Sequence, residues 1–154
     1  MASTSLQKNC KALEAIIGRL FTLAEDKGVE FDPGKTELIH FYGGKQALEY
    51  SITVSLGLTV TPKPVVRWLG VWLDSRLDFK AHVAKRVNSA TAAFQNLRRL
   101  TSTQKGLNFR SLRLLYTACV TTIADFGCQT WWKASGRQKG LIKPYQQLQN
   151  HLTV

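Results

Sequence analysis

Cysteine and histidine, the side chains that most often supply nucleophiles, bases and metal ligands, are few in this chain and widely spread. They are Cys10, Cys119, Cys128, His40, His82 and His151. The cysteines lack the paired spacing of a metal site, and no His-x-x-x-His pattern or neighbouring acid indicates a zinc site or a catalytic triad. Cys10 and Cys119 fall on apolar helical stripes, so we expect both to be buried small hydrophobes. The sequence therefore predicts no metal site and no cofactor.

The chemistry that remains is electrostatic, because the formal net charge of +11 is unevenly placed along the 154 residues. Residues 1–74 carry eight basic and eight acidic side chains, whereas residues 75–154 carry thirteen basic side chains and two acids. A one-sided basic surface favours polyanions, of which nucleic acid and anionic membrane are the usual ones. The alternative is a solvated face that keeps the chain soluble. The longest uncharged run, residues 50–62, is far below the ~20 residues that a membrane span needs, so we expect no membrane partner.

The elements that must position these charges begin with a predicted amphipathic helix from about Ser5 to Asp26. Its apolar residues repeat at alternating steps of four and three, and they are Leu6, Cys10, Leu13, Ile17, Leu20 and Ala24. Thr4 or Ser5 can cap this helix, and Gly28 can end it in the left-handed conformation. The following Asp32-Pro33-Gly34 predicts a turn.

Three later stretches predict strands. Residues 35–41 alternate in side-chain type, and residues 51–60 are rich in Ile, Val and Thr, with a break at Gly57 as an option. In residues 65–74 the side chains again alternate with a period of two, which predicts one strand through the middle of the chain. We therefore expect a small, mostly antiparallel sheet with one helix packed on it.

From Phe79 onward the apolar spacing lengthens to three and four, which predicts helices. Asp78 can cap the first helix, of about six turns, and Asn108 can cap a second one. Gly127 is expected to interrupt that second helix, and Pro144 suits the first turn of a last helix. The apolar stripe of the second helix comprises Phe109, Leu112, Tyr116, Cys119, Val120 and Ile123. A sheet with one helix, followed by helices alone, predicts the α+β class.

Three segments taken together resemble the reverse transcriptase of non-LTR, LINE-type retrotransposons. Residues 29–41 (Val-Glu-Phe-Asp-Pro-Gly-Lys-Thr-Glu-Leu-Ile-His-Phe) are similar to the lysine-containing palm motif D of that family. Residues 66–74 (Val-Arg-Trp-Leu-Gly-Val-Trp-Leu-Asp) are similar to motif E, the primer-grip hairpin at the entry to the thumb. Residues 114–132, with Leu-Leu-Tyr at the start and Trp-Trp at the end, are similar to a thumb segment. The order and spacing of the three segments make the resemblance specific, and the Phe-Asp-Pro-x-Lys-Thr-Glu form in residues 31–37 looks most like that of fungal elements.

The resemblance implies a palm remnant in residues 1–76 and a helical, thumb-like subdomain in residues 77–154 that is truncated at its C-terminus. In the family, the catalytic Tyr/Phe-x-Asp-Asp motif comes directly before the helix that residues 6–26 match, and this chain starts just past that point. Asp26 and Asp32, at a predicted helix end and in a turn, do not replace the missing pair. Because two-metal phosphoryl transfer requires clustered carboxylates, we expect no catalytic residue and no polymerase activity.

What the resemblance leaves is sequence-independent binding of an RNA/DNA duplex. In the family the motif D lysine, matched by Lys35, lies near the incoming triphosphate, although here we expect a plain surface lysine. Arg67 and Trp68 match the region that positions the primer end, but packing is expected for Trp68 and Trp72, as it is for Trp131-Trp132. The thumb-like cations that we expect to contact phosphate are Lys80, Lys85, Arg86, Arg98, Arg99, Lys105, Arg110 and Arg113.

Two functions of different classes follow. The first is a catalytically inactive reverse-transcriptase fragment with a basic, nucleic-acid-binding thumb surface. The alternative is a LINE-derived avirulence effector that acts through a host protein inside plant cells, for which powdery mildew fungi offer a precedent; a fragment that folds poorly is a third option. No secretory signal is visible, so we expect a cytoplasmic or nuclear location, or, for an effector, delivery without a conventional signal peptide. A further hypothesis is self-association through an exposed sheet edge.

Overall fold

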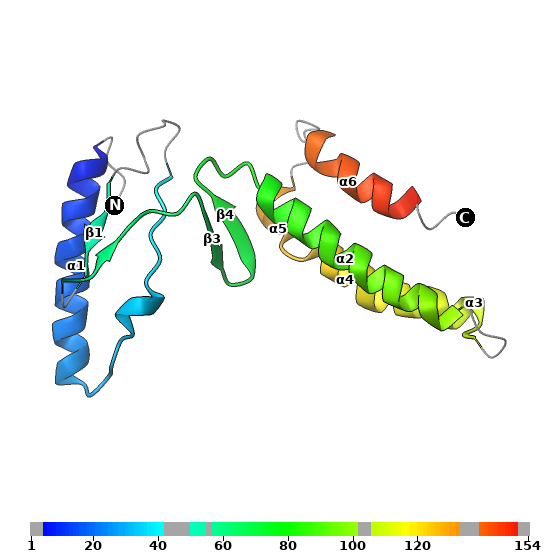
Figure 1. Cartoon of the computed structure of the whole chain (residues 1–154), viewed down its shortest axis with the longest axis horizontal. Helices are drawn as coiled ribbons and strands as arrows, with labels where there is room; N and C mark the ends of the chain where they lie inside the picture. The colour runs from blue at the N-terminus through cyan, green and yellow to red at the C-terminus, as the bar shows by residue number, and fades with distance from the viewer. Residues whose placement is uncertain (1–4, 42–49, 55–56, 102–105, 133–138, 151–154) are drawn as a thin grey trace. The chain divides into compact units, whose positions relative to one another are not determined.

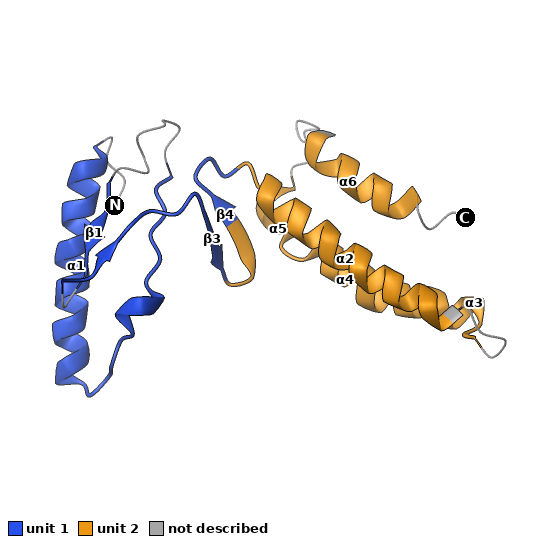
Figure 2. Ribbon diagram, in the orientation of Figure 1, with its two compact units in different colours: residues 1–68, 73–77 blue, residues 69–72, 78–154 orange. Residues whose placement is uncertain are grey.

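The computed structural model describes residues 5–41, 50–54, 57–101, 106–132 and 139–150. These form two compact units (Figure 2). Unit 1 comprises residues 1–68 and 73–77, and unit 2 comprises residues 69–72 and 78–154. Strands occur in the first half and helices dominate the second, so the predicted α+β class is confirmed. The domain boundary predicted after residue 76 stays a prediction, because units that are compact in space need not fold independently.

Unit 1 begins with helix α1 (Leu6–Asp26), at the bounds that the sequence predicts. The Ser5 hydroxyl accepts a hydrogen bond from the backbone N–H of Lys8, and Gly28 follows the helix with φ of +65°, so the predicted cap and stop are confirmed. The predicted apolar stripe is only partly buried, because Cys10 and Ala24 are covered while Leu13 and Leu20 are exposed. The strands that pack on α1 are too short to cover its whole apolar arc.

The sheet of unit 1 has two strands, β1 (Ile52–Thr53) and β2 (Thr59–Val60), which pair antiparallel with Ile52 opposite Val60. Of the two interpretations of residues 51–60, the one with a break at Gly57 is confirmed, because Gly57 adopts φ of +74° and lets the chain turn back. Buried side chains of α1, of the segment after Lys35 and of the β1 region form a core cluster of unit 1. They are Cys10, Leu38, Ile52 and Val54.

The strand predicted for residues 35–41 is also absent from the described structure. Pro33–Lys35 form a short 3-10 helix, η1, because the Asp32 carboxylate accepts a hydrogen bond from the Gly34 N–H at 2.9 Å and closes the turn early. Downstream, Leu38 makes an isolated parallel bridge to Pro62. Proline has no N–H to extend the pairing, which explains why a ladder does not form there.

A second two-stranded sheet consists of β3 (Val65–Trp68) and β4 (Val71–Asp74). Sequence alternation predicts one strand here, and this is wrong, because Leu69 and Gly70 turn the chain with φ of +47° and +84°. Positive φ at both central residues is typical of a type I′ hairpin turn, which joins antiparallel strands. The hairpin that the resemblance implies is thus present.

Unit 2 is helical after the hairpin. Its elements are α2 (Lys80–Thr101), α3 (Phe109–Leu115), the π-helix η4 (Tyr116–Thr121), α4 (Thr122–Asp125), α5 (Cys128–Trp131) and α6 (Lys139–Asn150). The predicted caps are confirmed, since Asp78 accepts from the Lys80 N–H at 3.1 Å and Asn108 accepts from the Ser111 N–H at 2.8 Å. Gly127 breaks the helix, as predicted, with φ of +73°.

The prediction for Pro144 is wrong, because α6 begins earlier, at Lys139, and Pro144 lies in its interior. Proline there removes one backbone hydrogen bond of the helix. Burial of Leu141 and Leu148 to either side of the proline holds α6 in place despite this loss. None of the helices among the described residues is both long enough and apolar enough to cross a membrane.

Within unit 2, α2 runs beside α4 and α6 (Figure 1). Their shared core consists of Ala90, Leu97, Val120, Ala124 and Leu148. A neighbouring cluster joins Val83 of α2 to Trp131 and Leu141. Core packing is confirmed for Trp131 and is wrong for Trp132, whose ring is exposed. The two rings point differently because Trp132 already leaves the helix, with an extended backbone.

The π-helix η4 explains a further error of the sequence prediction. Burial of Cys10 is confirmed, but Cys119 is exposed. A π-helix closes its hydrogen bonds over five residues instead of four, so it rotates the face that follows. The buried side of this helix accordingly steps from half-buried Leu115 to Val120 and then Ala124, which leaves Cys119 outside.

Candidate nucleic-acid interface

The tip of the β3–β4 hairpin presents apolar side chains to solvent. The side chains of Trp68 and Leu69 are 64% and 77% exposed. The packing expected for Trp68 is therefore wrong, and its indole can stack on an unpaired base. Leu69 also holds the left-handed backbone conformation, which costs a non-glycine residue about 1–2 kcal/mol. Strain and exposed apolar surface thus coincide at one turn.

His82, at the start of α2, fastens β4 to the helical part of unit 2. Its side chain is fully buried. The Trp72 N–H donates to Nδ1 at 3.2 Å, and Nε2 lies 2.9 Å from the Phe126 carbonyl oxygen. Because a backbone N–H can only donate and a carbonyl can only accept, the ring is neutral with its proton on Nε2. The hydrogen bonds of His82 could not be predicted from the sequence, because both partners are backbone groups that leave no pattern in the side chains.

The surroundings of His82 lower its pKa from the ordinary value near 6.5. Burial is the largest cause, because it penalises the imidazolium cation. The hydrogen bond to the Phe126 carbonyl acts in the opposite direction, while the nearby Arg86 cation lowers the pKa further. The ring therefore stays neutral at physiological pH, in the state that both of its hydrogen bonds require.

Arg86 belongs to the same junction. One terminal nitrogen, Nη2, donates to the Gly70 carbonyl at 2.6 Å, and the guanidinium carbon lies 4.1 Å from the centre of the Phe126 ring. Gly70 permits this arrangement, because a Cβ there would lie 3.0 Å from that ring. Arg86 is thus held by contacts within unit 2, and the case for phosphate binding rests on the other cations.

Lys85 lies one residue before Arg86 and makes a different contact. Its ammonium group sits 4.0 Å from the centre of the Trp72 ring, in a cation–π contact. Trp72 is half-buried, so the packing expected for this tryptophan is confirmed. Lys85 itself is exposed, which leaves its charge accessible to a phosphate.

The other cations of α2 lie at its two ends. Lys80 pairs with Asp78 at 3.2 Å, and Arg98 and Arg99 are exposed in the last turn. At about 100° a residue, Arg99 lies only some 40° around the helix from Lys85. Lys85 and Arg99 therefore mark one outward side of α2, some 20 Å apart along its axis.

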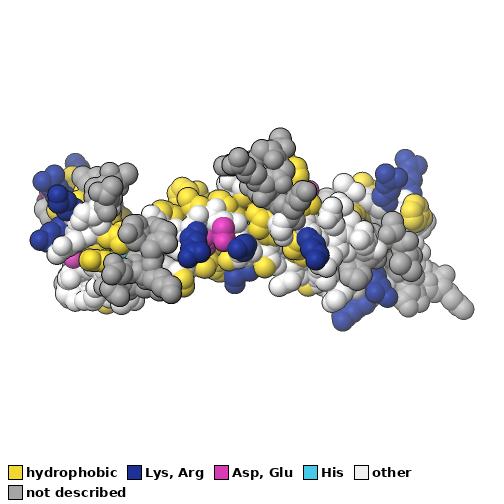
Figure 3. Space-filling model, turned by 90° about the horizontal axis from the view of Figure 1, so that it is seen from above, with side chains coloured by type: hydrophobic (Ala, Val, Ile, Leu, Met, Phe, Trp, Pro, Cys, Tyr) yellow, Lys and Arg dark blue, Asp and Glu magenta, His cyan; other side chains and the backbone are white. Residues whose placement is uncertain are grey.

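Arg110 and Arg113 are exposed on α3, whereas Lys105 lies outside the described residues. In unit 1, Arg67 is exposed on β3, and Lys35 is an exposed surface lysine, as expected, that pairs with Asp32 at 3.4 Å. On the face drawn in Figure 3, the described Lys and Arg side chains form separate small groups between apolar side chains. The structure thus distributes the predicted site residues over several elements of both units.

A cysteine and a histidine lie close together in unit 1, as a catalytic nucleophile and its base would, but their surroundings do not activate the thiol. Cys10 Sγ lies 3.9 Å from His40 Nε2, which itself lies 2.7 Å from the Tyr50 carbonyl oxygen. Burial, and to a smaller extent the nearby Glu14, raises the pKa of the Cys10 thiol. The thiol is therefore protonated and unreactive. Among the described residues, no group of three or more His, Cys, Asp and Glu could hold a metal ion.

Comparison with known proteins gives one informative likeness. Over 90 residues, 58% of this chain, the sequence is 30% identical to a protein described as a probable RNA-directed DNA polymerase from transposon BS of Drosophila melanogaster. The chain spans about a tenth of that relative's length. No family model and no solved structure matches. The chain therefore has a distant, partial similarity to a non-LTR transposon reverse transcriptase.

Proposed function

We propose that this chain corresponds to the palm-to-thumb junction of a LINE-type reverse transcriptase and binds nucleic-acid duplexes without sequence preference. One observation carries the proposal: residues 79–124 contain eight basic side chains and no acid. Described cations of this stretch are exposed on α2 and α3. The transposon reverse transcriptase to which the chain is similar acts on RNA and DNA, according to its description, and this supports the same ligand class.

The expected contacts are with phosphate rather than with base edges. Lysine and arginine on a convex helical surface bind the backbone of a duplex and release its counterions, which gives affinity without sequence reading. Independently of these cations, the exposed indole of Trp68 is suited to stacking on an unpaired base. We propose that these residues contribute binding rather than polymerisation, because exposed lysine and arginine side chains suit phosphate contacts and, among the described residues, carboxylates are not clustered as the two-metal reaction requires.

A titration with charge-reversal variants tests this proposal. The double variant Lys85→Glu/Arg99→Glu reverses two exposed cations on one side of α2 and should weaken binding of a fluorescent RNA/DNA hybrid at least tenfold, equally for unrelated sequences. The control Lys8→Glu/Lys11→Glu makes the same change of charge on exposed positions of α1 and should have a smaller effect. Equal losses in both variants, or a loss confined to one sequence, would contradict a phosphate-binding surface on α2.

The effector hypothesis stays a prediction. It requires a host protein that recognises this chain, and expression inside plant cells with a cell-death readout would test it. A response in at least one host genotype is expected under that hypothesis, and silence in every genotype would count against it.

A further inference from the structure

The side of α3 that faces solvent combines apolar and basic side chains. Phe109 and Leu114 are 80% and 71% exposed, and Arg110 and Arg113 lie between them around the helix. At about 100° a residue, these four side chains share an arc of roughly 140°, while Leu112 and Leu115 occupy the covered side. We refer to these four residues, Phe109, Arg110, Arg113 and Leu114, as the α3 face.

The surface next to the α3 face offers few free hydrogen-bonding groups. The hydroxyl groups of Thr117, Thr121 and Thr122 donate to backbone carbonyls four residues earlier, so they are satisfied within the helix. Among the described residues, neither Arg110 nor Arg113 has an ion-pair partner. Exposed aromatic and apolar side chains beside arginine are typical of a protein-binding surface. Contact with phosphate alone would not require large apolar side chains such as Phe109 and Leu114.

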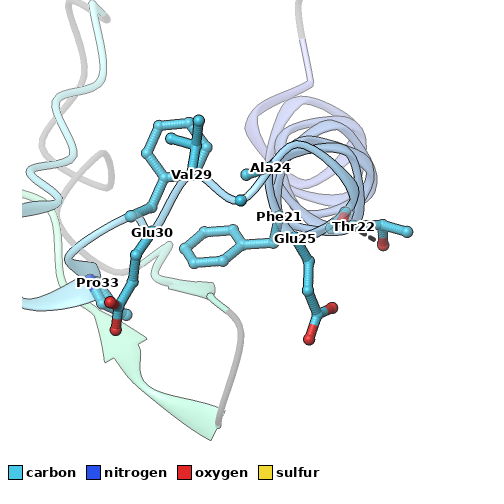
Figure 4. A pocket seen from close by; sticks show the side chains of 10 residues that line it. Phe21, Thr22, Ala24, Glu25, Val29, Glu30 and Pro33 are labelled. Carbon is cyan, nitrogen blue, oxygen red and sulfur yellow. Dashed lines mark hydrogen bonds between the residues drawn. The ribbon is translucent and has the colours of Figure 1, made fainter.

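Unit 1 contains a groove with aromatic walls and nearby carboxylates, which suits the apolar and basic side chains of the α3 face. We call it the α1 groove. It has a volume of about 660 Å³ between the C-terminal half of α1 and the segment that follows it. Phe21 and Phe31 lie in its wall with ring centres 5.5 Å apart, and Glu25 and Glu30 lie at its rim. Figure 4 shows Phe21 pointing from α1 toward the segment that carries Glu30 and Pro33.

The electrostatics of the α1 groove favour a cationic occupant. Glu25 and Asp26 lie in the last turn of α1, where the negative end of the helix dipole disfavours acids and no basic residue compensates within the turn. Among the described residues, Glu25 and Glu30 have no hydrogen-bond or ion-pair partner for their carboxylates. An arginine that reaches the rim would pair with a carboxylate and stack on an aromatic ring at once.

We propose that the α3 face of one copy of this protein docks into the α1 groove of a second copy. Phe109 then packs against Phe21 and Phe31, while Arg110 and Arg113 pair with the carboxylates at the rim. A groove of this volume is large enough for one aromatic side chain and its flanking cations. Nucleic acid competes for the same arginines, so a duplex that binds the α3 face would release the second copy.

The distribution of charge along the chain favours a second copy over other occupants. The first half of the chain is neutral and carries the acidic groove, whereas the second half holds all of the net charge of +11. Contact between the second half of one copy and the first half of another avoids bringing two basic halves together. Such a head-to-tail contact uses two different surfaces, so it produces rings where the rotation between copies closes and open oligomers where it does not. It differs from the sheet-edge pairing expected from sequence, which stays a prediction.

A charge-swap experiment tests the proposal. Sedimentation velocity of the wild-type protein at low salt should show a mean mass that rises between about 5 and 200 µM, the range of a small, weak interface. Glu25→Lys/Glu30→Lys makes the groove basic, and Arg110→Glu/Arg113→Glu makes the α3 face acidic. Each variant alone should remain monomeric, and an equal mixture of the two should associate as the wild type does. A wild type that stays monomeric, variants that associate alone, or a mixture that fails would overturn the proposal.

Two single variants remove the contact without endangering the fold. Gly18 lines the groove, and a Cβ added there meets no atom within 4 Å, so Gly18→Leu should fill the groove and abolish association while strengthening α1. Phe109→Ser should abolish association and leave the affinity for an RNA/DNA hybrid unchanged, which separates this proposal from nucleic-acid binding. Lys8→Glu/Lys11→Glu matches the charge change of the α3-face variant and should associate normally. Association that survives Gly18→Leu would overturn docking between copies. So would a wild-type protein that stays monomeric but binds phosphatidylserine vesicles, if Phe109→Ser abolishes that binding.

Discussion

At the scale of single residues, His82 and Arg86 hold the junction between β4 and the helices of unit 2. Both use backbone carbonyls as partners: Phe126 for the histidine and Gly70 for the arginine. The Phe126 ring lies under the guanidinium, and Gly127 leaves room for the imidazole. The backbone positions of Lys85 and Trp72, which flank this junction, are therefore fixed by buried contacts rather than by surface charge.

Neutral His82 makes the stability of the fold depend on pH. The pKa of His82 is lowered in the folded state, so the unfolded state binds more protons below about pH 6.5. The free energy of unfolding should therefore be highest above that pH and fall as the pH drops below it, through the lowered pKa of the folded state. Urea unfolding between about pH 7.5 and 5 measures this. His82→Gln, which cannot take up a proton, should be less stable at pH 7.5 and show a flatter profile; an unchanged profile would contradict the assignment to His82.

Gly127 should tolerate no side chain. Its φ of +73° is unfavourable for alanine, and a Cβ would lie 3.2 Å from both His82 Nε2 and Val71 Cγ2. Gly127→Ala should lower the free energy of unfolding by about 2 kcal/mol. Gly18→Ala is the matched control, because its Cβ meets nothing within 4 Å in the interior of α1, and it should stabilise by up to about 1 kcal/mol. Equal effects at the two glycines would contradict the close packing described for Gly127.

At the scale of elements, the β3–β4 turn carries strain that substitution can relieve. Leu69 holds φ of +47° with its side chain exposed, so it contributes little packing in return. Leu69→Asn creates the Asn-Gly pair that type I′ turns favour and should raise the free energy of unfolding by about 1 kcal/mol. Leu69→Val, which is β-branched and poorly suited to positive φ, should lower it. If thermal unfolding ranks valine above asparagine, the turn does not have the conformation described here.

Elements whose signals are local could be predicted from the sequence. The bounds of α1, the cap at Asn108 and the break at Gly127 each follow from a residue type with one favoured backbone geometry. The errors arise where the pattern is ambiguous. Alternating side chains on both sides of Leu69-Gly70 look like one continuous strand, although they belong to two strands that turn back on each other. The π-helix η4 has no sequence signature, so the predicted buried stripe wrongly included Cys119, which lies on the exposed side.

At the scale of the whole molecule, the candidate site was predictable in composition and not in arrangement. Counting charges along the sequence is enough to place the basic excess in the second half. Counting charges does not reveal that Arg86 donates to the Gly70 carbonyl and lies over the Phe126 ring, because those residues lie 16 and 40 positions away in the chain. The exposed tip with Trp68, and the apolar side chains of the α3 face, were likewise hidden, since burial depends on which neighbours the fold supplies.

Cooperative unfolding is expected within unit 2, because its helices share the core formed by Ala90, Leu97, Val120, Ala124 and Leu148. Leu97→Ala should therefore lower the stability of the whole unit by about 2–4 kcal/mol, whereas the exposed Leu100→Ala should change it by less than about 0.5 kcal/mol. Circular dichroism during thermal unfolding measures both variants. A broad, non-cooperative transition in the wild type would indicate the poorly folded fragment instead.

The salt dependence of duplex binding tests the central claim most directly. If about four phosphates are contacted by exposed cations of α2 and α3, raising the salt from about 50 to 200 mM should weaken binding of an RNA/DNA hybrid by about 100-fold, in a linear log–log plot. Lys85→Glu/Arg99→Glu should make that slope shallower by about two contacts. Absence of binding near 50 mM salt, or an affinity that is indifferent to salt, would contradict the proposal that this chain holds nucleic acid through its basic helices.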